Sequence, residues 1–63
     1  MNLKILQDRL KKKYEITRFA TRTSYVIHLG QKGCVIAQFN DDKLVKIIVD
    51  GKEKEEIEKL LLD

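Results

Sequence analysis

The chain has 63 residues, of which 37% are charged and 43% hydrophobic, with a net charge of +3, one cysteine and no proline. This length allows one small domain, residues 1–63, which buries only about 60% of its unfolded surface and would gain from a second copy. The single Cys34 excludes an intramolecular disulfide and a Cys-x-x-Cys pair. No run reaches the roughly 18 apolar residues of a membrane span, and Lys4 and Asp8 interrupt the apolar core that a signal peptide needs. These features predict a cytoplasmic domain with no membrane partner.

The first predicted element is an amphipathic helix near the N-terminus. Asn2 can cap it, because a short polar side chain accepts a hydrogen bond from the first helical N–H groups. The apolar residues Leu3, Leu6, Leu10 and Tyr14 then recur at spacings of three and four residues. This stripe predicts a helix with one face against a core.

Four runs rich in β-branched and aromatic residues follow, and turn formers separate most of them. The expected strands span residues 15–20, 25–29, 34–39 and 44–49. Because the connections 30–33 and 40–43 are short, neighbouring strands should pair antiparallel in a meander. The turn at 21–24 lacks glycine, so the first two runs can also be one bent strand. The sequence predicts three to four strands.

A closing helix is expected over residues 52–62. Asp50 and Glu53 have the spacing of a capping box, in which an acid accepts from backbone N–H groups and a glutamate reaches back. The apolar stripe of this helix consists of Ile57, Leu60 and Leu61. The predicted fold class is α+β, with the order helix, antiparallel meander, helix, and both helices on one face of the sheet.

This element order resembles that of double-stranded-RNA-binding domains in outline. The closing helix of that family begins with a basic cluster that grips phosphates, whereas the corresponding stretch here, Gly51-Lys-Glu-Lys-Glu-Glu56, is acidic. The proline-containing binding loop of that family has no counterpart in a chain without proline. Since many unrelated small domains share the order, we assign the chain to no family.

Enzymatic chemistry would have to be built on His28 and Cys34, because the chain has no other histidine or thiol. In the register expected for a four-residue loop, Leu29 faces Cys34 and His28 faces Val35, which puts thiol and imidazole on opposite faces of the sheet. We therefore predict a protein that is not an enzyme. The sequence has no signature of a metal, a cofactor or a small-molecule ligand.

The same register assigns the strand residues to two faces. The more continuous apolar face is expected to meet both helices. The other face is predicted to stay uncovered and to serve as an interaction face, with the residues Val26, Val35, Phe39, Leu44, Lys46 and Ile48. An ordinary exposed antiparallel face alternates with polar residues, so an apolar one indicates a contact with another molecule.

The net charge is unevenly distributed. Residues 1–33 carry eight basic and two acidic side chains, a net +6, whereas residues 34–63 carry five basic and eight acidic ones, a net −3. Either the first half offers a basic binding face, or the two halves neutralise each other across a contact. The candidate nucleic-acid contacts are Arg9, Lys11, Lys12, Lys13, Arg18 and Arg22.

Two functional hypotheses follow. The favoured one is a small non-enzymatic interaction or regulatory module that binds itself or another protein through the uncovered face; accessory proteins of bacteria or their phages have this size and composition. The alternative is a nucleic-acid-binding domain that uses the basic N-terminal half. Few aromatic residues and an acidic second half count against the alternative.

Overall fold

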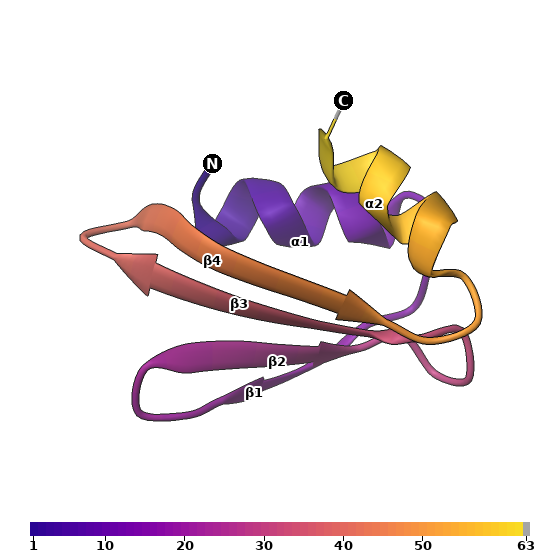
Figure 1. The fold of residues 1–63 in the computed structure, drawn as a ribbon, viewed down its shortest axis with the longest axis horizontal. Coiled ribbons are helices and arrows are strands. Elements are labelled where there is room, and N and C mark those ends of the chain that lie inside the picture. The colour runs from indigo at the N-terminus through magenta and orange to yellow at the C-terminus, as the bar shows by residue number, and fades with distance from the viewer. Residues whose placement is uncertain (63) are drawn as a thin grey trace.

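The computed structural model describes residues 1–62 as an α+β fold in which two helices lie on one side of a four-stranded sheet (Figure 1). The elements are α1 (Leu3–Lys11), β1 (Thr17–Ala20), β2 (Ser24–His28), β3 (Cys34–Asn40), β4 (Lys43–Asp50) and α2 (Lys54–Leu62). The strands pair antiparallel in the order β1-β2-β3-β4. The predicted class and element order are confirmed, and the count is four strands.

The first helix has the cap and the buried stripe that its sequence predicts. The Asn2 Oδ1 atom accepts a hydrogen bond from the Ile5 N–H at 2.9 Å, which satisfies one donor at the helix start. Leu6 and Leu10 are fully buried, and Tyr14, which follows the last helical turn, is also buried. One face of α1 therefore contributes to the core.

The pairing of β2 with β3 differs from the predicted register by one residue. His28 lies opposite Cys34, because the turn needs only three residues. The Leu29 N–H donates to the Gly33 carbonyl at 2.9 Å, and Gly30 takes a φ of 65°, which glycine adopts without steric cost. Since a shift of one residue exchanges the faces of a strand, β3 presents its other side to the helices.

Three residues of the predicted interaction face are therefore in the wrong place. Val35 is fully buried in the core, and Phe39 and Leu44 are partly buried and pack against it. The Phe39 ring also lies edge-on to the ring of Tyr25, at 6.0 Å between centroids. The prediction that these residues form an uncovered face is wrong, because it assumed a turn one residue too long.

A β-bulge restores the predicted faces in most of β4. Gln38 lies opposite Lys46, but its neighbour Phe39 lies opposite Leu44, which leaves Val45 without a partner on β3. This second shift of one residue compensates for the first. Ile48, like Lys46, consequently lies on the face away from the helices, as the sequence predicts.

The start of α2 differs from the predicted capping box. The Asp50 carboxylate accepts from the neighbouring Gly51 N–H at 2.9 Å, and from no other backbone N–H within residues 1–62. The Glu53 side chain turns toward Tyr14 and Lys32 instead of back to the helix start. The helix begins at Lys54, two residues later than expected, and the Glu53 carbonyl accepts a hydrogen bond of its first turn from the Ile57 N–H at 2.9 Å.

Two glycines bring the turn after β2 against the turn after β4. Gly51 has a φ of 118°, and a Cβ atom there would lie 2.3 Å from the Gly33 Cα. The two backbones also share a hydrogen bond, from the Glu53 N–H to the Lys32 carbonyl at 3.0 Å. Any side chain at Gly51 would separate these turns, so the glycine pair helps to set the path of the chain into α2.

The core lies between the helices and the facing side of the sheet. Its buried residues are Leu6, Leu10, Tyr14, Ile27, Leu29, Val35, Ala37, Ile57 and Leu61. Within residues 1–62, neither helix has the length and hydrophobicity to cross a membrane.

Candidate functional site

The face of the sheet away from the helices, called here the open face, carries an apolar row across all four strands. Each member of the row lies directly opposite the next one on the neighbouring strand. The row consists of Phe19, Val26, Ile36 and Ile48. Cross-strand neighbours of this kind have Cβ atoms about 5 Å apart, so the four side chains form one continuous apolar surface.

Three members of this apolar row are substantially exposed. The exposed fraction is 55% for Phe19, 37% for Ile36 and 45% for Ile48, while Val26 is half-buried between its neighbours. Phe19 adds an edge-to-face contact with the His28 ring, at 5.5 Å between centroids. Exposed apolar residues that stand singly are ordinary, but a row that crosses a whole sheet is typical of a binding surface.

Polar rows flank the apolar row on both sides. One row consists of Ser24, Gln38 and Lys46, and the other of Thr17, His28, Cys34 and Asp50. Lys46 and Asp50 thus lie on opposite sides of Ile48 along β4, and both are exposed. An apolar centre with a polar rim is the usual anatomy of a protein interface.

The structure corrects the predicted separation of His28 and Cys34, because the two residues are direct cross-strand partners on the open face. Asp50 lies on the other side of Cys34, so the order is imidazole, thiol, carboxylate. Burial, followed by the Asp50 charge, raises the pKa of the Cys34 thiol. A nucleophilic cysteine needs a lowered pKa and a neighbouring base that a carboxylate orients. In this row the pKa of the thiol is raised instead, and the carboxylate lies beside the thiol rather than beside the imidazole.

Metal binding has no support in the described part of the chain. Within residues 1–62, no three His, Cys, Asp or Glu side chains are close enough together to hold one ion. The adjacent Asp41 and Asp42 form the turn between β3 and β4, with φ angles of 52° and 65°. Asp tolerates this left-handed conformation in hairpin turns, which accounts for both residues without a ligand.

Several of the basic candidates have intramolecular partners. The Arg9 Nη1 atom donates to the Leu61 carbonyl at 2.7 Å, near the end of α2. Lys13 lies 3.6 Å from a Glu56 carboxylate oxygen, and the Arg18 guanidinium stacks 5.6 Å from the centre of the Tyr25 ring. The Lys13–Glu56 ion pair is the kind of contact expected if the two halves of the chain neutralise each other in part.

The remaining basic candidates do not gather on one surface. Lys11 and Lys12 are exposed at the end of α1. Arg22 is exposed in the turn between β1 and β2, and this turn lies at the opposite end of the molecule from the C-terminal end of α1 (Figure 1). A polymer of phosphates is usually bound by a continuous basic stripe, and this arrangement does not provide one.

Glu53 is the centre of a polar cluster that the sequence did not reveal. Its carboxylate accepts from the Tyr14 hydroxyl at 2.8 Å and lies 3.2 Å from the Lys32 amine and 4.0 Å from the Lys13 amine. The Tyr14 and Lys32 hydrogen bonds lower the pKa of Glu53. Burial and the same carboxylate raise the pKa of Tyr14 to about 12. The cluster ties α1, the β2–β3 turn and α2 together.

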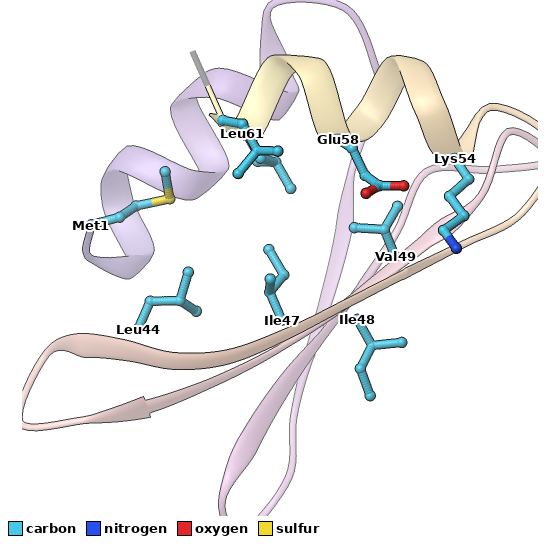
Figure 2. A pocket seen from close by; sticks show the side chains of 9 residues that line it. Met1, Leu44, Ile47, Ile48, Val49, Lys54, Glu58 and Leu61 are labelled. Carbon is cyan, nitrogen blue, oxygen red and sulfur yellow. The ribbon is translucent and has the colours of Figure 1, made fainter.

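A groove of about 390 Å³ lies beside β4, between that strand, α2 and the N-terminus (Figure 2). Its lining is mostly apolar and consists of Met1, Leu44, Ile47, Ile48, Val49, Lys54, Glu58, Leu61 and Leu62. Figure 2 shows Ile47 and Val49 pointing toward the helices, whereas Ile48 points to the other side of β4. The groove therefore follows the edge of the sheet and meets the open face at Ile48.

Comparison with known proteins provides no relative: no protein-family model matches the chain, and no curated protein or solved structure matches it significantly.

Proposed function

We propose that the chain is a small, non-enzymatic protein-interaction module that associates with a second copy of itself through the open face. The observation that carries the proposal is the apolar row from Phe19 to Ile48, which no element within residues 1–62 covers. A domain of this length is short of buried surface, so it gains more than a larger protein would from an apolar contact. The unpaired thiol of Cys34 is consistent with a cytoplasmic accessory protein.

The charges beside the row favour a second copy as the partner. Two copies can stack with their open faces together, related by a two-fold axis that runs parallel to the apolar row, midway between the two sheets. The apolar row of one copy then lies against the apolar row of the other, and each polar row lies against the opposite polar row of the other copy. Lys46 of one copy then faces Asp50 of the other, and this pair occurs twice. The open face is thus complementary to itself both in its pattern of apolar and polar rows and in its charges. This complementarity sets the orientation of the two sheets.

The test is the molar mass in sedimentation equilibrium. We expect the unmodified chain to self-associate. The assembly of the Ile36→Glu variant should have half the molar mass of the unmodified assembly, because burying an unpaired carboxylate in an apolar interface costs free energy. The matched control is Ile5→Glu, since Ile5 is 43% exposed on α1, close to the 37% of Ile36. A monomeric unmodified chain at millimolar concentration, or an Ile36→Glu variant of unchanged mass, would contradict the proposal.

A further inference from the structure

The second edge of the sheet offers an independent surface for assembly. β4 is an edge strand of eight residues, twice the length of the opposite edge strand β1. The Met1 carbonyl accepts from the Leu44 N–H at 3.3 Å and so occupies one end of this edge. From Lys46 to Asp50, no backbone group within residues 1–62 pairs with the outer side of the strand. Exposed edges of this kind pair readily with another strand.

We propose that β4 pairs antiparallel with β4 of a second copy, and that the groove beside it takes part in the contact. This contact goes beyond the stacking of open faces, because it uses another surface of the chain. Two copies related by an axis perpendicular to the sheet would form one eight-stranded sheet. Their α2 helices would meet above the joined edges.

The residues of β4 permit one register in which every pair matches. Ile48 lies opposite its own copy, which keeps the two faces of the joined sheet in phase because side chains alternate along a strand. Lys46 then lies opposite Asp50 of the second copy on the open face, twice. On the helix side, Ile47 lies opposite Val49. Opposite charges and β-branched pairs are the favourable cross-strand combinations.

The helix side of the edge is complementary to itself as well. Lys54 and Glu58 both line the groove, one helical turn apart on α2. The proposed axis makes the two α2 helices antiparallel, so Lys54 of one copy meets Glu58 of the other. Leu62, which is 79% exposed and also lines the groove, gains an apolar contact there. These features favour a second copy over a foreign peptide as the occupant.

The two proposed contacts combine into a closed assembly. The two-fold axis that relates the stacked open faces runs parallel to the apolar row. The two-fold axis that relates the joined β4 edges is perpendicular to the sheet and passes beside Ile48, at the end of that row. The two axes therefore meet at a right angle. Two perpendicular, intersecting two-fold axes generate four copies and no open chain of subunits. Each Lys46 would lie beside one Asp50 within its sheet and against another across the sandwich.

A charge swap on α2 tests the edge contact without touching the open face. We expect sedimentation equilibrium to find four chains for the unmodified protein and two for Lys54→Glu, because each copy then presents two like charges to its neighbour. The double variant Lys54→Glu/Glu58→Lys restores the opposite charges and should return the mass to four chains. Circular dichroism checks that each variant keeps its fold.

The outcomes separate the two contacts. An unmodified dimer that Lys54→Glu leaves intact and Ile36→Glu dissociates overturns the edge contact and keeps the stacked faces. An unmodified dimer that Lys54→Glu dissociates and Ile36→Glu leaves intact keeps the edge contact and overturns the proposed function. If the mass is unaffected by Lys54→Glu, or the double variant fails to recover, the edge contact is wrong.

Discussion

The two faces of the sheet are built from similar residues, yet the helices cover most of one face and leave the other accessible to solvent. On the helix side, Ile27, Val35 and Ala37 are fully buried beneath α1 and α2. On the open face, Ile36 and Ile48 come from the same strands as Val35 and Val49, one position along the chain, and keep 37% and 45% of their surface exposed. Two helices of nine residues each suffice for one face only. The difference teaches that register, and not residue type, decides whether an apolar strand residue is buried in the core or exposed on the open face.

The largest expected contrast is in stability. Ile57→Ala, in the covered core, should lower the free energy of unfolding by about 2–5 kcal/mol, because it leaves a cavity between α2 and the sheet. Ile48→Ala, on the open face, should lower it by less than about 1 kcal/mol at micromolar concentration, where few copies associate. Urea unfolding measures both values. Equal losses would mean that the open face is packed as tightly as the core.

A smaller effect should appear with pH through the Glu53 cluster. The hydrogen bonds from Tyr14 and Lys32 lower the pKa of Glu53 in the folded chain, so its contribution to stability is present above the pKa of an unfolded glutamate. This contribution is lost as the pH falls through the folded pKa. We expect Glu53→Gln to flatten the acid side of the stability profile, and Tyr14→Phe to flatten it in part. A Glu53→Gln profile parallel to that of the unmodified chain would contradict the role of this cluster.

Local patterns in the sequence were sufficient for the elements but not for their register. The spacing of Leu6 and Leu10 predicted α1, and the cap by Asn2 is confirmed. The face of β3 depended on whether the turn after Leu29 has three or four residues, and nothing in Gly30-Gln-Lys-Gly33 decides between them. A difference of one residue moved Val35 into the core.

The contacts of the candidate site that were missed join residues far apart in the chain. Glu53 and Tyr14 are 39 positions apart, and Arg9 and Leu61 are 52 apart. Such partners depend on how the helices are placed over the sheet, which no local spacing reveals. Ile36 was missed for the same reason that Val35 was misplaced, because the turn between β2 and β3 sets the face of β3. Phe19 was missed because its face follows from the pairing of β1 with β2, which the sequence did not specify.

The most direct test of the open face as the contact surface is a dilution series of the labelled protein, observed through its backbone amide signals in NMR spectra. From millimolar to micromolar concentration, we expect the amides of β1 to β4 around Phe19, Val26, Ile36 and Ile48 to shift together, with the amides of α1 unchanged. Shifts confined to the helices, or spectra that do not depend on concentration, would contradict the account.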